Sequence, residues 1–441
     1  MRIPRDRFLL IGVAAMIGGI VVSQVAPRAA VLSNRTSTYA AVACPSDNAA
    51  GSSTALLTSS KLGARTVKVG NTKSSAAGVY KYAITNGVLF DGSPNTVLYS
   101  ARDSGSSLGA SICTAGMSDE WFVGGSAGIT SKGGIDLVNS GLSDSIVDLF
   151  AFNAKTSLPV TTVTIKADTD KFVPLDALAP GSDQIVVHAI TRSGQVSASL
   201  VDIRRKGLAS LGLDFVSPVS APSTHLVIPA LSNGSTSSPM SETVRLFVPG
   251  GVDASIGATV YSRDGSFAPL GLDGLKVPHG VVVDYPLKNL VTSSPFALSL
   301  SSDQPILASV FSSPAKSTAD FAWSATAAAL TPGAPLVMNP GGLLPTLAFL
   351  NTHGNVNVGI SWRGANGKSG SVTLSGSNFV SWQPTAGLNR LTVTTNQSET
   401  YGGAIFAAGI NSGFSYLPLA KGSALLTAAL PHSDARVISR G

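Results

Sequence analysis

Charged side chains are scarce in this sequence. Only 12% of the 441 residues are Asp, Glu, Lys or Arg, against about 25% in typical soluble domains. The formal net charge of +6 is thinly spread, and four arginines against one aspartate in the first 30 residues supply half of it. Nucleic-acid binding needs a basic stripe interleaved with aromatic side chains. The sequence shows no such stripe, so we expect no nucleic-acid partner.

Aromatic residues are also few, at 6%, but 44% of the residues are hydrophobic. That hydrophobic content can offset the entropy of the chain, unlike in charge-rich disordered segments, so folded modules are expected. With so few charges, the polar surface must consist mainly of Ser, Thr, Asn, Gln and Gly, a composition typical of extracellular β-rich proteins. The length is sufficient for roughly three domains.

The N-terminal segment predicts export. Three arginines precede residues 8–26, which carry no charge and form either the apolar region of a signal peptide or a short membrane-spanning helix. Pro27 and Arg28 occupy the place where small residues should mark a cleavage site, which favours the uncleaved anchor. The arginines should stay in the cytoplasm, which places the bulk of the chain outside. We therefore expect either a cell-membrane protein with a single anchor or a secreted protein.

Cysteine is rarer still, with Cys44 and Cys113 as the only two. In an exported chain these allow one intramolecular pairing, which an oxidising compartment favours over two free thiols. A Cys44–Cys113 disulfide is therefore predicted. It would stabilise the fold by about 4 kcal/mol in the chain-entropy model.

Residues 121–149 mark the start of an internal repeat with a period of roughly 105 residues. Four landmarks recur in the same order: a first apolar strand, an alternating strand, a second apolar stretch and a pair of strands interpreted as a hairpin. The first strand lies at residues 135–139, 243–248 and 346–351, and the final pair at 185–201, 296–311 and 391–406.

Short strands with frequent turns, and no helix of a dozen residues, predict an all-β fold. Each repeat is long enough to enclose its own core, which favours tandem immunoglobulin-like β-sandwiches. A β-propeller is the alternative, but three repeats of this length do not divide naturally into four-stranded blades. Before the repeats, Asn86-Gly87 and neighbouring turn residues predict antiparallel hairpins.

These observations predict seven segments. They are a signal or anchor at 1–30, a flexible Ala/Ser/Thr/Asn-rich spacer at 31–65, an N-terminal β segment at 66–130, sandwiches at 131–236, 237–340 and 341–430, and a tail at 431–441.

Several motifs together resemble an uncharacterised family of exported actinobacterial proteins, a domain family of unknown function. They are the basic and apolar N-terminus, the Cys44-Pro45 pair, Cys113 shortly before WFVGGS at 121–126, DLVNSG at 136–141 and IVDLFAFN at 146–153. The resemblance covers residues 40–410. It implies an anchored or secreted envelope protein and supports the disulfide, but it implies no activity.

Motifs for catalysis or metal binding are weak. Residues 124–128 match G-x-S-x-G, but ITSKGG follows, where a nucleophile elbow requires a helix, so a glycine-rich turn is predicted. The five histidines, His188, His225, His279, His353 and His432, are far apart, which argues against a zinc site. Asp168 and Asp170 lack the further ligands of a calcium loop and predict a hairpin turn. No catalytic, metal or cofactor residue is predicted, and no cofactor is expected.

Two further groups of residues have alternative interpretations. Asp119, Glu120, Asp148 and Glu242 could form the acid pair of a glycosidase, but nothing in the sequence selects a pair. Trp323, Trp362 and Trp382 could stack on sugars, although core packing is favoured. The expected function is therefore a non-catalytic envelope or secreted protein that presents β-sandwiches, with an envelope polysaccharide or another envelope protein as candidate partner. The alternative is an extracellular enzyme that processes glycans or the cell wall.

Overall fold

The computed structural model describes residues 40–46, 52–57, 63–66, 75–76, 79–84, 87–91, 96–102, 107–234, 239–287, 290, 293–315, 320–407 and 413–419. All of them belong to one compact unit, Ala40–Leu425. Strands dominate the described residues, and the one helix among them, α2 (Leu175–Leu178), has a single turn. The all-β prediction is confirmed. Residues 8–26, the tail at 431–441 and His432 lie outside the described residues.

The strands fall into four consecutive units. The first unit contains β1 (Ala40–Cys44), β2 (Ser52–Leu57), β3 (Gly63–Thr66), β4 (Ser75–Ala76), β5 (Val79–Ile84), β6 (Val88–Asp91), β7 (Leu98–Arg102) and β8 (Leu108–Ile112). The second contains β9 (Asp119–Val123), β10 (Gly134–Asn139), β11 (Ser145–Asn153), β12 (Thr161–Ile165), β13 (Thr169–Pro174), β14 (Ile185–Ser193), β15 (Val196–Lys206) and β16 (Ala209–Val216).

The third and fourth units repeat this pattern with some strands fused. The third contains β17 (Ser223–Leu231), β18 (Met240–Phe247), β19 (Ala254–Ser262), β20 (Gly265–Phe267), β21 (Leu275–Val277), β22 (Val282–Leu287), β23 (Phe296–Pro314) and β24 (Ala322–Ala325). The fourth contains β25 (Leu336–Met338), β26 (Leu344–Gly364), β27 (Ser369–Trp382), β28 (Leu388–Thr394), β29 (Thr400–Ala407) and β30 (Phe414–Pro418).

Each unit is a pair of antiparallel sheets with one strand order. In the second unit the sheets are β12-β11-β14-β9 and β13-β10-β15-β16. The third unit reproduces this order, with the two halves of β23 in different sheets, and the fourth reproduces it with the halves of β26 and β27. This order differs from the ABED and CFG sheets of an immunoglobulin constant domain.

The first unit follows the same order, with β1-β6-β3 in one sheet and β5-β2-β7-β8 in the other, although β4 pairs with β5. The structure thus contains a fourth copy where the sequence predicted a spacer at 31–65 and a separate β segment. Its strands are short and rich in Ala, Ser and Gly, so their composition is that of a linker and their alternation is too brief to be recognised.

The predicted hairpins are wrong in detail. β14 and β15 are consecutive, but β14 pairs with β11 and β9 whereas β15 pairs with β10 and β16. Likewise β5 and β6, on either side of Asn86-Gly87, lie in different sheets. At these points the chain crosses from one sheet of the unit to the other. Consecutive strands therefore supply apolar side chains to the shared core from both sides. By contrast, Asn139 ends β10 as predicted, and β18 ends at Phe247, next to the predicted end at 248. The predicted end at Asn351 is wrong, because β26 continues through this residue to Gly364.

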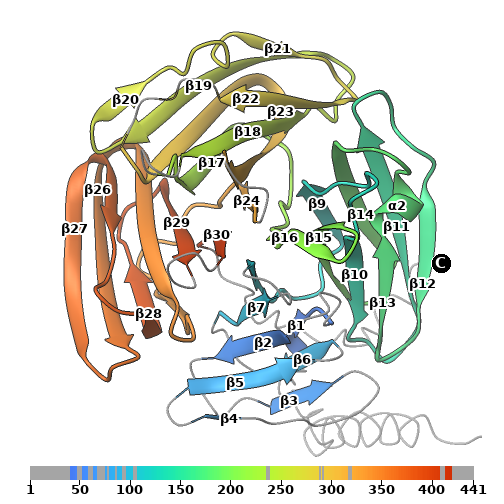
Figure 1. Ribbon diagram of the computed structural model, residues 1–441, viewed down its shortest axis with the longest axis horizontal. Helices are drawn as coiled ribbons and strands as arrows, with labels where there is room; N and C mark the ends of the chain where they lie inside the picture. Colours follow the sequence, from blue (N-terminus) through green and yellow to red (C-terminus); the bar gives the residue numbers. More distant parts are fainter. Residues whose placement is uncertain are drawn as a thin grey trace, which may run out of the picture. The chain divides into compact units, whose positions relative to one another are not determined.

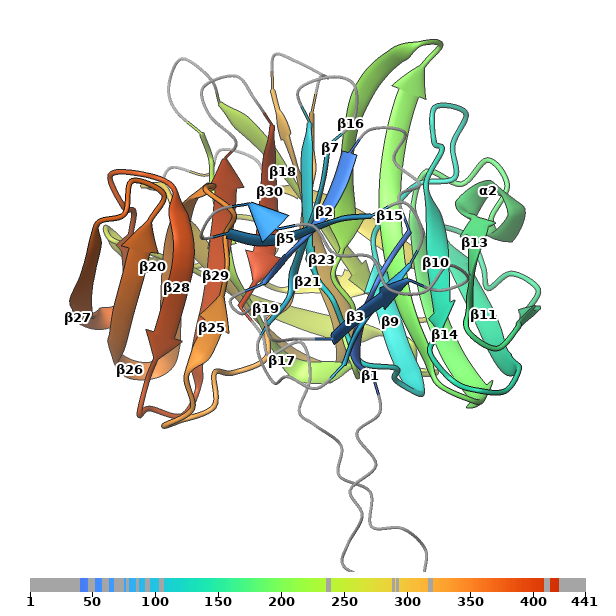
Figure 2. The same ribbon diagram turned by 90° about the horizontal axis from the view of Figure 1, so that it is seen from below.

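The four units close into a ring around a common centre (Figure 1). Seen from below, the first unit, in blue, lies between the second and the fourth (Figure 2). Apolar side chains pack between the first and second units, the second and third, the third and fourth, and the fourth and first. At the centre β8 contacts β16, β16 contacts β24, β24 contacts β30, and β30 contacts β8. Closure about an axis is a feature of propellers, the alternative considered above, but here each unit has two facing sheets.

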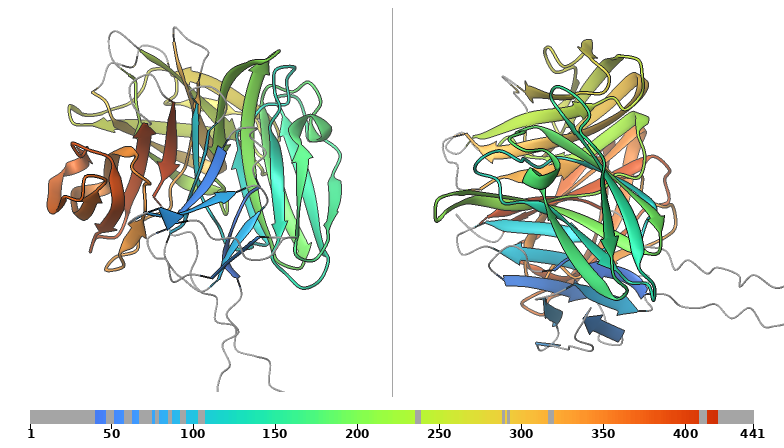
Figure 3. Two further views of the ribbon diagram at one scale, coloured as in Figure 1. Left: turned by 60° about the horizontal axis from the view of Figure 1, so that its bottom comes forward. Right: turned by 90° about the vertical axis from the view of Figure 1, so that its right-hand side faces the viewer.

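Every ladder pair among the described strands joins strands of the same unit. Contact between units therefore depends on side chains and isolated hydrogen bonds. In Figure 3 the right panel turns the second unit toward the viewer, with its two layers crossing. The core of this unit draws on both sheets, with Ile135 and Leu137 on β10 facing Val147 and Leu149 on β11.

The predicted disulfide is present. Cys44 at the end of β1 is bonded to Cys113 just after β8, and Ala43 donates its backbone N–H to the Thr114 carbonyl, at 2.8 Å. In the second unit Trp121 and Val219 exchange backbone hydrogen bonds at the equivalent place. The disulfide thus closes the first unit where the second has only hydrogen bonds, and it indicates an oxidising, extracytoplasmic environment. Among the described residues no helix is long and apolar enough to cross a membrane.

Candidate functional site

A buried polar network joins the four central strands. Asp214 on β16 accepts hydrogen bonds from the Trp323 backbone N–H at 2.7 Å and from Ser415 Oγ at 2.6 Å. Ser415 Oγ in turn accepts from the Ala110 N–H on β8, at 3.0 Å. Burial raises the pKa of Asp214 well above its ordinary value, while its hydrogen bonds oppose the shift. The Asp214 carboxyl group and the Ser415 hydroxyl group together thus connect all four units.

A cavity of about 380 Å³ lies where these central strands end. Its wall includes Ser111, Ile112 and Thr114 around the end of β8, residues 217–221 after β16, residues 326–329 after β24, and Pro418 at the end of β30. The same position in each unit therefore contributes to one wall. Cavities of 300–1,000 Å³ are typical of small-molecule sites.

Glu120 is the most unusual residue of this wall. Alternation along β9 directs Glu120 to the same side as Phe122, whose ring lies in the core of the second unit. The carboxyl group therefore lies at the edge of that core, next to the cavity, and the residue is 2% exposed. Burial raises its pKa from 4.5 to about 8, the nearby charge of Asp119 adds to the shift, and a hydrogen bond from the Ala198 backbone opposes it.

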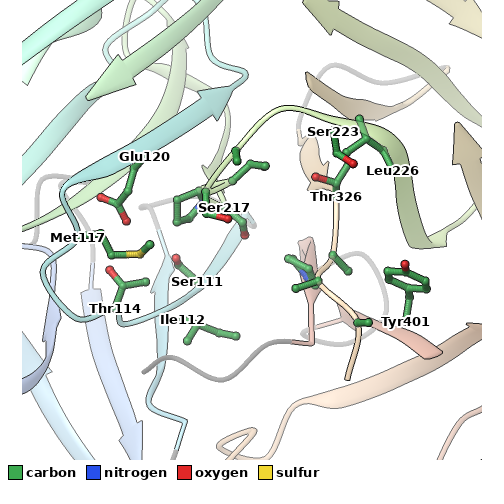
Figure 4. A pocket seen from close by; sticks show the side chains of 18 of the residues that line it. Ser111, Ile112, Thr114, Met117, Glu120, Ser217, Ser223, Leu226, Thr326 and Tyr401 are labelled. Carbon is green, nitrogen blue, oxygen red and sulfur yellow. The ribbon is translucent and has the colours of Figure 1, made fainter. Parts of the chain in front are cut away.

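Glu120 and Thr114 form a polar corner of the cavity. Within the described part of the chain, no protein group hydrogen-bonds to Glu120 Oε1 or to Thr114 Oγ1, and both atoms are buried. Figure 4 shows the side chain of Met117 between these two residues. Met117 is 40% exposed, and its unbranched side chain can adopt several conformations. We refer to Glu120, Thr114 and Met117 as the polar corner.

The opposite wall is formed by the third and fourth units. Leu226 on β17 and Tyr401 on β29 lie across the cavity from the polar corner (Figure 4). Tyr401 donates its hydroxyl hydrogen to Glu399, at 2.8 Å, and burial together with this bond raises its pKa to about 12. Of the described residues that line the cavity, Glu120 is the one carboxylic acid, and none is Lys or Arg.

Comparison with known sequences identifies the family but not its activity. Residues 90–378 match the family of unknown function DUF5719. The chain belongs to this family. No curated protein matches the sequence. The match begins in β6 and ends in β27, so it includes all of the second and third units of this DUF5719 protein.

The structure separates the acids that the sequence singled out in this DUF5719 protein. Asp119 lies beside Glu120 but points away from the cavity toward His188, with 2.7 Å between Oδ1 and Nε2. Asp148 pairs with Arg192 and accepts from Thr162. Glu242 accepts a hydrogen bond from Ser312, and burial raises its pKa well above the ordinary value. Only Glu120 reaches the cavity.

The G-x-S-x-G segment is a turn. Residues 124–128 run irregularly between β9 and β10 with no helix after Ser126, and Gly125 has φ of 88°. Ser126 Oγ accepts a hydrogen bond from the Gly128 N–H, at 3.1 Å. Asp168, with φ of 52°, lies in a turn between β12 and β13. The predicted hairpin is wrong here, because β12 pairs with β11 and β13 pairs with β10 in the other sheet. Among the described residues no three His, Cys, Asp or Glu side chains gather as a metal site.

The tryptophans are core residues. Trp323 is fully buried and donates its indole N–H to Asp202, at 3.0 Å. Trp362 and Trp382 are partly buried and pack on the core of the fourth unit, 6.5 Å apart. The favoured core interpretation is confirmed for Trp323, whereas Trp362 and Trp382 each remain partly exposed.

Sequence reasoning missed the cavity and its polar corner. The one available signal was Glu120, which directly precedes Trp121-Phe122-Val123 in the same predicted strand. The alternation of that strand predicts a buried position at Glu120, and an acid rarely occupies such a position. Thr114 and residues 217–221 carry no comparable signal, because their role depends on where the four units meet.

Proposed function

We propose that this protein is a non-catalytic, extracytoplasmic binding protein whose four β-sandwich units hold one small molecule in the central cavity. The observation that carries the proposal is that equivalent segments of all four units form the wall, next to a buried carboxyl group with an unpartnered oxygen. Rigid elements that present a few polar groups in a mostly apolar cavity are the usual basis of ligand binding.

A glycan-processing enzyme is the competing function. Both retaining and inverting glycosidases generally use two carboxylic acids on either side of the bond that they cleave. Of the described residues that line the cavity, one is a carboxylic acid, and Asp119 next to it faces His188. This arrangement favours binding over glycoside hydrolysis at this site.

The binding proposal can be tested by filling the cavity. Ala328 lines the cavity and is exposed, so Ala328→Trp should block it without disturbing a core. Ala365, an exposed residue after β26, provides the matched control as Ala365→Trp. With the low-molecular-mass fraction of an envelope extract, native mass spectrometry should show an unchanged small molecule on the wild-type protein and the control, but not on Ala328→Trp. A molecule retained by Ala328→Trp, or recovered chemically altered, would contradict the proposal.

The N-terminal sequence and the disulfide both support a location outside the cytoplasm. We propose that residues 8–26 either anchor the chain in the cell membrane or act as a secretion signal. A reporter that is active only outside the cytoplasm, fused after residue 36, should give a signal, and the mass of the mature chain distinguishes an anchor from a cleaved signal. A fusion protein that remains in the cytoplasm with an inactive reporter would refute export.

A further inference from the structure

We propose that the polar corner of the central cavity binds the ammonium group of an amine whose apolar body lies along the cavity. This inference rests on the proposed binding function and specifies the class of ligand. It begins from the two buried oxygen atoms, Glu120 Oε1 and Thr114 Oγ1, which lack a protein partner among the described residues. A buried polar atom without a partner is costly, so such atoms at a cavity wall point to a ligand group that pairs with them.

The chemistry of the corner selects a donor. An ammonium group has three N–H donors and no acceptor, which matches a carboxylate oxygen and a hydroxyl oxygen. An anionic ligand meets no permanent positive charge, because no described residue of the cavity wall is Lys or Arg. A neutral hydroxyl group can also pair with Glu120, but it lacks the charge that strengthens a hydrogen bond to a carboxylate.

The cavity can accommodate the body of such a ligand. Its volume of about 380 Å³ exceeds that of a small aromatic amine, and Ile112, Val219 and Leu226 contribute apolar wall. Met117 is the movable part of the corner. Because both oxygens are buried and Met117 lies between their residues (Figure 4), the ammonium group reaches them when this side chain changes rotamer.

Binding of a cation at this place is linked to a proton. Burial favours the protonated form of Glu120, so an ammonium group that pairs with the carboxylate must displace the proton to solvent. The titratable groups around it are Asp119 on the same strand, His225 on β17 and Tyr401 on β29. Asp119 points toward His188, and Tyr401 is bonded to Glu399, so of these acids only Glu120 is placed to lose its proton when the ammonium group binds.

The test uses three probes with one aromatic body: 2-phenylethylammonium, 2-phenylethanol and 3-phenylpropionate. Calorimetry at pH 7 in two buffers of different ionisation enthalpy gives affinity and proton release together. We expect the ammonium probe to bind at least about tenfold more tightly than the alcohol, with close to one proton released per ligand. The carboxylate should bind most weakly.

Two variants test whether the polar corner is the place where the ammonium group binds. Glu120→Gln keeps the shape of the side chain but cannot ionise, so it should abolish the preference for ammonium and the proton release while alcohol binding persists. Thr114→Val should weaken ammonium binding by a smaller factor. Equal affinity for ammonium and alcohol, or an unchanged preference in folded Glu120→Gln, would overturn the amine inference and leave the binding proposal intact. If none of the probes binds, the amine inference is wrong, and the extract experiment with Ala328→Trp decides the binding proposal.

Discussion

At the scale of single residues, Glu120 stands out because it is an acid at a buried position of a largely apolar strand. The three residues that follow it on β9, Trp121 to Val123, are apolar and buried, and an acid beside them is costly unless it is paired. Sites where one local rule is broken are commonly functional, because the surrounding structure must stabilise the misfit. The cavity beside Glu120 offers the reason for its position.

The raised pKa of Glu120 predicts a pH dependence of stability. The native state holds the proton more tightly than the unfolded chain, so stability is greatest below pH 4.5 with respect to this group and falls as pH rises toward 8. Because one pKa unit corresponds to about 1.4 kcal/mol, the loss amounts to several kcal/mol. Glu120→Gln should remove this contribution, so the variant gains stability relative to wild type between pH 5 and pH 8.

Urea denaturation at several pH values measures this difference. Asp176→Asn serves as the control, because Asp176 is an exposed acid on α2, and it should follow the wild-type curve. A constant difference between Glu120→Gln and wild type across the range would show that Glu120 titrates normally in the folded protein.

At the scale of elements, the four central strands depend on Asp214. Its carboxyl group accepts from β24 and β30, and Ser415 continues the connection to β8. None of these strands pairs with another in a ladder, so such isolated bonds and side-chain packing must align them. A satisfied buried network of this kind favours one arrangement of the strands over others.

Asp214→Ala should therefore be strongly destabilising. The change leaves the Trp323 N–H and the Ser415 hydroxyl without this acceptor, at about 1–3 kcal/mol for each buried group. Asp303→Ala is the matched control, since Asp303 accepts one backbone N–H from Ser255 at an exposed site and should cost little. The midpoint of thermal unfolding measures both, and equal midpoints for the two variants would refute the role of the network.

At the scale of the whole molecule, closure of the ring predicts cooperative unfolding. Independent tandem sandwiches would unfold in separate steps, whereas each unit here buries apolar surface against two others. Calorimetry of the protein should show one unfolding transition of residues 40–425, with equal calorimetric and van't Hoff enthalpies. A chain that ends at residue 330 lacks the fourth unit and exposes surfaces of the first and third, so it should lose this transition. Several resolved transitions, or a truncated chain with the full unfolding temperature, would support independent domains.

The sequence by itself determined the all-β class, the position of many strands, the three long repeats and the disulfide. These features depend on local alternation, on turn residues and on the presence of only two cysteines. The repeat landmarks correspond to β10, β18 and the first half of β26, because the strands that fill a core keep their apolar side chains at a fixed spacing.

Only the tertiary structure decided how the strands are distributed between sheets, that β1 to β8 form a fourth unit, and that the units close into a ring. Strands such as β14 and β15 alternate in the same way whichever sheet they join, so their pattern cannot show the crossing. The cavity could not be predicted from the sequence either. Glu120, Thr114 and Leu226 come from three units, and their proximity is a consequence of the packing between units, which leaves no periodic signal along the chain.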